Sequence, residues 1–210
     1  MMEHYYTEKP VSKIKETQFS HEFFGKKLDF VSVSGVFAFG DRIDKASLLL
    51  IESFRPSGAS FFVLDVGCGF GPIALCIKAR YPHLQVTAVD INERAVEYTK
   101  RNADINNLYI EVAKSDLYEA LEGRQFGDIV SNPPIAAGKK VYTRLITDAY
   151  DHLIDGGALW LTAFHNKGGK TLKRIMEETF GNVEDVVKKG GIRVYRSVKA
   201  KNDSSVPQYE

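Results

Sequence analysis

Along most of this chain, apolar residues recur with the periods of strands and helices in turn. The alternation over Leu28–Val33 predicts a strand, Ser34-Gly35 predicts a turn, and Val36–Phe39 predicts a returning strand. The pattern therefore predicts a short β-hairpin ahead of the main fold. A helix is expected next, beginning after Asp44 as N-cap and ending at Ser53.

Strands and helices then alternate to the end of the chain. Strands are predicted at Phe61–Val66, Gln85–Val89, Tyr109–Ala113, Phe126–Ser131, Ala158–Phe164, Val183–Val187 and Ile192–Val198. Helices are predicted at Pro72–Tyr81, from Asn92 as N-cap to about Asn106, at Lys139–Leu153 (where Asp155-Gly156-Gly157 stops it) and at Lys170–Phe180. The alternation predicts an α/β fold with a doubly wound, Rossmann-like sheet of seven mostly parallel strands. Because no helix separates the final two strands, we expect one of them to run antiparallel to its neighbour.

The chain of 210 residues has room for one domain. We expect an N-terminal extension over residues 1–27, because this segment is polar, evenly charged and weakly periodic. The domain itself is expected over residues 28–201, and residues 202–210 are expected to form a flexible tail.

Charge and composition exclude several classes of protein. The formal net charge of +1 cannot attract nucleic acid in bulk, so any polyanionic partner needs a local basic patch. No apolar run approaches the roughly 18 residues of a membrane span, and the first residues lack the layout of a secretion signal, so we expect a cytoplasmic protein with no membrane partner. The two cysteines, Cys68 and Cys76, form no Cys-x-x-Cys pair, and the histidines show no metal spacing. We therefore expect no metal, and either a monomer or a homodimer.

A glycine-rich loop follows the first strand of the main sheet and reads Asp65-Val-Gly67-Cys-Gly69-Phe-Gly71-Pro72. Gly67 and Gly69 allow a tight turn and a close approach of the backbone to a ligand. A dinucleotide-binding loop would carry a third spaced glycine where Pro72 stands, which disfavours a nicotinamide dehydrogenase. Asp65, just ahead of the loop, suits a cationic ligand better than a phosphate.

Acidic residues also stand directly after the next two strands. Asp90 lies 19 residues after Gly71 and can accept hydrogen bonds from both hydroxyls of a ribose. Asp116 can accept from an adenine amino group while Leu117 packs against the ring. A single aspartate in such a place is more often a solvated loop acid or a helix cap. Three of them at successive strand ends, beside a glycine loop, indicate an adenosine-containing ligand.

The loop D-V-G-C-G-F-G, followed by Asp90 and Asp116, resembles the class I S-adenosylmethionine-dependent methyltransferases. The resemblance implies a seven-stranded sheet with an antiparallel last strand and S-adenosyl-L-methionine as cofactor. The cofactor-binding residues that it implies are Asp65, Gly67, Gly69 and Gly71 near the methionine end, Asp90 and Ile91 at the ribose, Asp116 and Leu117 at the adenine, and Asn132 at the methyl group.

The fourth strand is followed by Asn132-Pro133-Pro134-Ile135. Two consecutive prolines cannot continue a strand, and on their own they would indicate only a rigid end of the strand. In this position, however, the Asn132 side-chain oxygen and the Pro133 carbonyl can each accept one N–H of a planar amine. They would turn its lone pair toward a sulfonium methyl group, and Pro134 would stiffen the corner. Such acceptors position the amine and stabilise the charge that develops on it.

This loop resembles the Asp/Asn-Pro-Pro motif of methyltransferases that act on planar nitrogens, and the resemblance implies that Asn132, Pro133 and Pro134 are catalytic. The usual fourth residue is aromatic and stacks on the target ring, whereas this chain has Ile135, an apolar contact with weaker stacking. Ser34-Gly35-Val36-Phe37, Asp44-Lys45, N-P-P-I-x-x-G-K and Gly191–Arg196 further resemble the small-domain branch of the 16S rRNA guanine 2-amino methyltransferases and their archaeal relatives. The bacterial enzymes carry a second, degenerate domain that we do not expect in this chain.

Basic side chains would then have to contact the RNA. Residues 167–201 contain ten Lys and Arg against four Asp and Glu, an excess of six, and Lys139 adjoins the Asn-Pro-Pro loop. Such runs are equally often solvated faces. Phe37 and Phe39 are candidate walls for a flipped base, although aromatic residues are more often core.

These observations favour methyl transfer to the exocyclic 2-amino group of a guanine in rRNA or tRNA. Adenine 6-amino methylation on RNA or DNA needs the same geometry. Glutamine methylation of a release factor ranks lower, because those enzymes usually carry a helical domain ahead of the glycine loop. A non-catalytic, cofactor-binding RNA scaffold is the alternative outside enzymes, but such proteins often lose the catalytic loop that is intact here.

Overall fold

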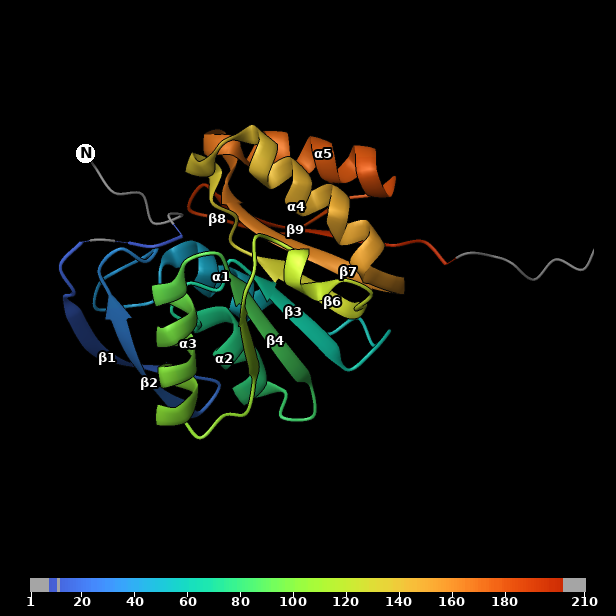
Figure 1. Ribbon diagram of the computed structural model, residues 1–210. Coiled ribbons are helices and arrows are strands. Elements are labelled where there is room, and N and C mark those ends of the chain that lie inside the picture. Colours follow the sequence, from blue (N-terminus) through green and yellow to red (C-terminus); the bar gives the residue numbers. More distant parts are fainter. Residues whose placement is uncertain (1–7, 11, 202–210) are drawn as a thin grey trace, which may run out of the picture.

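A seven-stranded sheet forms the centre of the protein in the computed structural model, which describes residues 8–10 and 12–201 (Figure 1). The tail expected at 202–210 lies outside the described residues. The strand order is β5-β4-β3-β6-β7-β9-β8. The strands are β3 (Phe62–Val66), β4 (Gln85–Asp90), β5 (Glu111–Lys114), β6 (Phe126–Ser131), β7 (Leu153–Phe164), β8 (Glu184–Lys189) and β9 (Ile192–Val198). β9 alone runs opposite to the other six strands, which confirms the predicted seven-stranded sheet with an antiparallel last strand.

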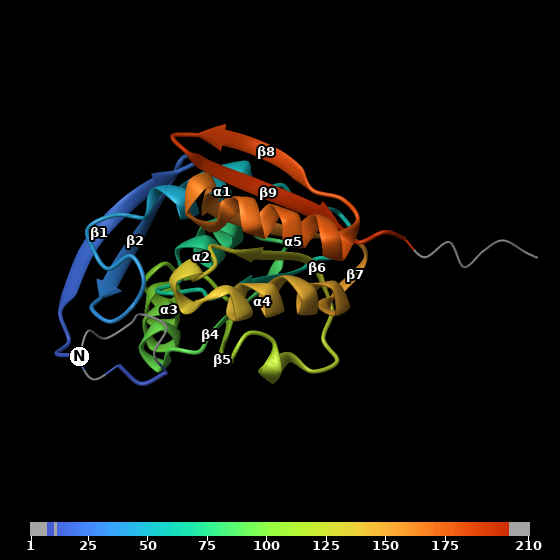
Figure 2. The ribbon, with the colours of Figure 1, turned by 90° about the horizontal axis from the view of Figure 1, so that it is seen from above.

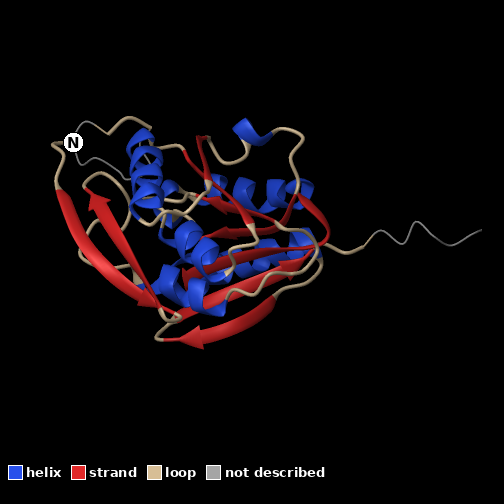
Figure 3. Cartoon of the chain, turned by 90° about the horizontal axis from the view of Figure 1, so that it is seen from below, coloured by secondary structure: helices blue, strands red, loops and turns tan. Residues whose placement is uncertain are grey.

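Helices cover both faces of the sheet, as the doubly wound prediction requires (Figures 2 and 3). One face carries α1 (Lys45–Ser53), α2 (Pro72–Arg80) and α3 (Glu93–Ile105), and the other carries α4 (Lys139–His152) and α5 (Lys170–Phe180). Successive residues of a strand point to opposite faces, so Val63 packs in the first core and Leu64 in the second. None of the helices in the described part of the chain is long and apolar enough to cross a membrane.

The predicted hairpin is present, but its second strand was assigned wrongly. It pairs β1 (Glu16–Phe23) with β2 (Lys26–Val33), and the expected returning strand Val36–Phe39 forms turns instead. β1 buries only Phe23 among its eight residues and therefore shows little apolar signal in the sequence. It lies within the residues 1–27 that we expected to be an extension, and the expected domain start at residue 28 falls inside β2.

Helix α3 fixes this hairpin against the main fold. The Asn102 side-chain oxygen accepts from Val31 N at 2.8 Å, and its Nδ2 donates to Val31 O at 3.0 Å and to Phe70 O at 2.8 Å. One buried side chain therefore joins β2, α3 and the end of the glycine loop. The segment that leaves β2 is thereby held beside this loop, where Val36 packs close to Gly69.

The other predicted elements are present, with two shifts. The strand expected at Tyr109–Ala113 is β5, which begins at Glu111. The glycines expected to stop a helix lie inside β7, at a break in its register with β6. A Cβ built on Gly157 would lie 2.8 Å from Gly127 O, so a glycine stands at position 157 because β6 and β7 approach closely there.

Candidate active site

The residues predicted to bind the cofactor gather at the carboxyl edge of the sheet, where strands β3 to β6 end. A hollow of about 190 Å³ there is lined by Val66, Gly67, Asp90, Ile91, Ser115, Asp116, Leu117, Pro134, Ala137, Val141 and Leu145. A second, narrow hollow is lined by Phe37, Ala38, Asp44, Ser47, Gly67, Cys68, Gly69, Phe70, Pro72, Ile73 and Asn132. The two share Gly67, so they form one site with Gly67 at its middle.

The glycine loop is pinned so that its backbone faces this site. Gly67 N and Cys68 N both donate to Val89 O, at 2.8 and 3.0 Å. Gly67 has φ 76°, and a Cβ built on it would meet nothing within 4 Å, which leaves open space for a ligand. Gly71 lines neither hollow: it caps α2 with φ 94°, and a Cβ there would lie 3.0 Å from Thr99 Cγ2. Gly71 therefore serves the packing of α2 on α3.

Asp65 is fully buried and lines neither hollow. Its Oδ2 accepts from Ala74 N at 3.1 Å, and its Oδ1 has no hydrogen-bond partner among the described residues. Burial, with a contribution from the charge of Asp90, raises the pKa of Asp65 to about 8. A buried carboxyl group with one orphaned oxygen beneath the loop fits a ligand that carries positive charge.

Asp90 and Asp116 lie in different environments. Asp90 Oδ2 accepts from Gly69 N and Oδ1 from Asn92 N, both at 2.9 Å, while burial raises the pKa of Asp90 to about 6. Asp116 is partly exposed and lies 3.7 Å from Arg144 Nη1. Leu117 beside it is buried with φ 53°, a left-handed conformation that leucine rarely adopts. This backbone strain is typical of functional sites.

The side chain of Asn132 is held in one orientation. Its Nδ2 donates to Asp44 Oδ1 at 3.2 Å and to Ser47 Oγ at 3.0 Å. Because both N–H bonds are used, the oxygen is the end of the amide left for a ligand. Asp44 is itself fixed as the N-cap of α1, where Oδ1 also accepts from Ala46 N at 3.0 Å.

The two prolines form a tight turn. Pro134 has φ −74° and ψ 81°, and Ile135 N donates to Pro133 O at 2.9 Å, as in an inverse γ-turn. A carbonyl oxygen has two lone pairs, so Pro133 O can accept one more hydrogen bond. Pro133 itself is buried and lines neither hollow, whereas Asn132 lines one and Pro134 the other.

The residues predicted to bind the substrate are more dispersed than those predicted to bind the cofactor. Phe37 lines the hollow with Asn132, whereas Phe39, 41% exposed, lines neither hollow. Lys139 is exposed at the first residue of α4. Ile135 is half-buried, and a Cβ built on Gly168 would lie 2.8 Å from its Cγ2, so Ile135 packs against the turn between β7 and α5.

The sequence did not predict Asp44 and Ser47 as site residues. Asp44 was recognised as a helix cap, but its contact with Asn132 joins residues 88 positions apart. No local pattern signals such a contact. The lining residues Ala137, Val141 and Leu145 were missed because they look like an ordinary apolar helix face.

The fold and this site define a class of protein. A doubly wound sheet with an antiparallel β9, a glycine loop after β3 and acids at the carboxyl ends of β3, β4 and β5 are the features of class I methyltransferases.

Comparison with known proteins agrees with this class. Residues 27–196 match the family described as methyltransferase small domain. Over 203 residues the chain is 38% identical to the uncharacterized protein YbxB of Bacillus subtilis, covering 96% of this chain and 99% of that protein. Ribosomal RNA small subunit methyltransferase C of Aeromonas hydrophila is 35% identical over 175 residues, covering 81% of this chain and 49% of that enzyme.

A solved structure is also similar. The T. thermophilus 16S rRNA N2 G1207 methyltransferase (RsmC), in complex with AdoMet and guanosine, matches with a TM-score of 0.77 and 27% identity. The match covers 90% of this chain and 52% of that one, so the chain spans about half the length of these rRNA methyltransferases. The chain belongs to the methyltransferase small domain family, and it is an S-adenosylmethionine-dependent methyltransferase.

Proposed function

We propose that this protein transfers a methyl group to the exocyclic 2-amino group of a guanine in rRNA or tRNA, in the cytoplasm. The observation that carries the proposal is the fixed amide of Asn132, whose oxygen is left free for a ligand and which lines a hollow together with Gly67 and Gly69. The similar T. thermophilus structure is a complex with AdoMet and guanosine, which supports guanine as the acceptor base.

The residues at the carboxyl edge fit the cofactor. We assign Asp90 and Ile91 to the ribose, and Asp116 and Leu117 to the adenine, because all four line the larger hollow. Gly67 and Gly69 would lie beneath the methionine portion, and the orphaned Asp65 oxygen would lie near its positive charge. When bound, the cofactor supplies a methyl group on a positively charged sulfur.

Asn132 and Pro133 would orient the acceptor. Each offers one oxygen to one N–H of the amine, which turns the nitrogen lone pair out of the plane of the ring. Asp44 and Ser47 prevent the Asn132 amide from flipping, so the acceptor oxygen is in place before the substrate binds. The same two oxygens stabilise positive charge that develops on the nitrogen. Alignment of this kind can supply about 7–11 kcal/mol of a reaction barrier, so no strong base is required.

Methylation of adenine at the 6-amino group is the second candidate, because it needs the same pair of acceptors. The guanosine bound in the similar T. thermophilus structure favours guanine over adenine. Glutamine methylation would also use these acceptors, but nothing in the lining of the two hollows favours a peptide.

Nucleoside analysis tests the proposal. The protein is incubated with S-adenosylmethionine labelled in its methyl group and with undermethylated cellular RNA, and the RNA is digested and separated. We expect labelled N2-methylguanosine in the rRNA or tRNA fraction. Labelled N6-methyladenosine would establish the second candidate instead, and RNA without any labelled nucleoside would contradict both.

A further inference from the structure

A hollow separate from the cofactor site lies beside the exposed ring of Phe164, the last residue of β7. It has a volume of about 490 Å³ and is lined by Lys45, Leu48, Leu49, Glu52, Phe164, Lys189, Gly190 and Ile192. We call it the Phe164 hollow. Phe164 is 45% exposed, whereas Leu49 and Ile192 are buried and form an apolar floor. A half-exposed aromatic ring over apolar side chains is a surface on which a planar group can stack.

The Phe164 hollow adjoins the candidate active site through α1. Asp44 and Ser47, at the start of this helix, hold Asn132, and the neighbouring Lys45 and Leu48 line the hollow. β7 is parallel to β6, so Phe164 lies at the same edge of the sheet as Asn132.

The turn after Phe164 also touches the Asn-Pro-Pro loop. Gly168, with φ 98°, packs against Ile135 so closely that a Cβ would lie 2.8 Å from Ile135 Cγ2. On its other side, His165 N donates to Gly191 O at 2.9 Å, which fixes the turn to the β8–β9 hairpin. The Phe164 hollow, this turn and the catalytic loop are therefore one continuous surface.

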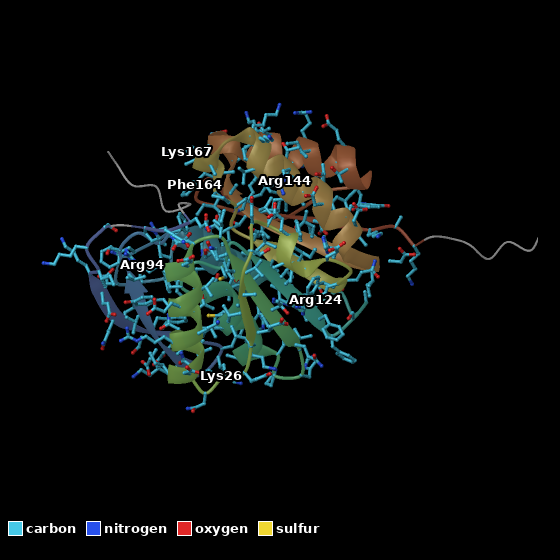
Figure 4. The ribbon with its side chains drawn as sticks, in the orientation of Figure 1. Lys26, Arg94, Arg124, Arg144, Phe164 and Lys167 are labelled. Carbon is cyan, nitrogen blue, oxygen red and sulfur yellow. The ribbon has the colours of Figure 1, made fainter. Side chains whose placement is uncertain are left out.

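Basic side chains around the hollow are available for a partner, whereas many others in this region are already paired. Lys173, Lys188 and Arg193 surround Asp185, while Arg174 pairs with Glu178, Arg196 with Glu184, and Lys199 donates to Tyr150 O and Leu153 O. Lys45, Lys167 and Lys189 form no ion pair within residues 8–10 and 12–201. Lys167 Nζ lies 5.9 Å from the centre of the Phe164 ring, and Figure 4 shows the two side by side.

We propose that the Phe164 hollow binds a nucleotide that neighbours the target in a single-stranded RNA segment. The base stacks on Phe164 above the apolar floor, and the flanking phosphates lie against Lys45, Lys167 and Lys189. Only Glu52 among the lining residues is acidic, so the rim is positive overall. This combination of an aromatic platform and spaced cations is how proteins hold single strands without reading their sequence. The inference rests on the proposed function, because it places the strand that carries the target base.

Fluorescence anisotropy with a labelled single-stranded RNA oligonucleotide tests the proposal without depending on the chemistry. Phe164→Ala should weaken binding at least about fivefold, because one stacked base contributes about 1–3 kcal/mol. Phe164→Trp should restore the affinity. The matched control is Phe61→Ala, which removes an exposed ring (65%) at the opposite edge of the sheet. It should leave binding unchanged.

Salt dependence tests the lysines. The variant with Lys45, Lys167 and Lys189 all changed to Ala should lower the slope of log affinity against log salt by about 0.7 for each phosphate that it no longer neutralises. The exposed Lys100→Ala on α3 serves as the control and should leave the slope unchanged. Equal RNA affinity for the wild type and Phe164→Ala, or an unchanged salt slope, would overturn the proposal. If the binding effects are found but no guanine is methylated, the proposed acceptor is wrong and the proposed RNA-binding hollow stands.

Discussion

At the scale of single residues, the site depends on an amide whose orientation is fixed by two neighbours. Asn132 presents one oxygen to the acceptor because Asp44 and Ser47 take both of its N–H bonds. Replacing Asn132 should therefore slow the methyl-transfer step and leave the affinity for the cofactor almost unchanged. We predict that Asn132→Ala lowers kcat by about 100-fold or more, as for other charge-stabilising groups that are removed. Steady-state turnover and calorimetric titration with S-adenosylmethionine check the two parts. Unaltered turnover would remove Asn132 from its assigned role.

Asp44 positions Asn132 and also caps α1, and the two roles can be separated. Serine is an equally good N-cap, but its shorter side chain does not reach Asn132. We predict that Asp44→Ser lowers kcat by about five- to tenfold, the equivalent of one hydrogen bond, with little change in melting temperature or in the affinity for S-adenosylmethionine. Asp41→Ser changes an exposed acid of the same segment and should have no effect. A fall in cofactor affinity instead of kcat would show that Asp44 contacts the cofactor.

The raised pKa of Asp65 predicts a pH dependence of cofactor binding. With a pKa of about 8, the free protein carries a proton on Asp65 at pH 7, and a cationic ligand binds better to the ionised form. The ratio of wild-type to Asp65→Asn affinity for S-adenosylmethionine should therefore rise through pH 8 and level off above about pH 9, one unit above the pKa. Because the titration of the cofactor itself changes both affinities equally, it does not affect their ratio. A ratio that is flat across this range would contradict a charge contact at Asp65.

The same shift affects stability in the free protein. Asp65 binds its proton more tightly folded than unfolded, where its pKa is about 3.9, so its contribution to stability decreases as the pH rises from about 4 toward 8. Ionised Asp65 therefore destabilises the free protein. A buried carboxyl group with a raised pKa and an unpartnered oxygen is typical of a functional site, where a ligand supplies the missing partner.

At the scale of elements, the turn between β7 and α5 supports the catalytic loop. Gly168→Ala places a Cβ 2.8 Å from Ile135 Cγ2 at a positive φ, so we expect both lower stability and lower turnover. Gly181→Ala has a similar backbone cost at φ 70°, but its Cβ would meet nothing within 4 Å. Thermal melts should show a loss in both variants, of about 1–2 kcal/mol for the control. Turnover should fall only in Gly168→Ala, and equal turnover in the two would contradict the support role.

The element pattern also shows what the sequence can and cannot predict. The order of strands and helices, the seven-stranded sheet and the gathering of Gly67, Asp90 and Asp116 at one edge followed from periodicity and from the rule that parallel strands end together. β1 was missed because only Phe23 of its eight residues is buried, so the pattern predicted that the partner of β2 follows it in the chain instead of preceding it. The contact of Asp44 with Asn132 could not be predicted, since it depends on how α1 packs across the end of β6.

At the scale of the whole molecule, the hairpin is attached to the sheet domain through α3, and Asn102 makes the buried hydrogen bonds of this attachment. Asn102→Ala leaves Val31 N, Val31 O and Phe70 O without their partner in a buried place. We predict a loss of about 3 kcal/mol or more in the free energy of unfolding, since each buried unpaired group costs about 1–3 kcal/mol. Urea unfolding measures it. Asn106→Ala removes three hydrogen bonds from a less buried residue of the same helix and should cost clearly less. Equal losses would show that burial is not the cause.

The proposed chemistry depends above all on the oxygens of Asn132 and Pro133 holding an amine opposite the activated methyl group. A crystal structure with S-adenosylmethionine bound would show whether they can. We expect the methyl carbon to lie in front of Asn132 Oδ1, with room for one nitrogen about 3 Å from each. A methyl carbon directed away from Asn132, or a cofactor bound outside the two hollows that meet at Gly67, would contradict this arrangement.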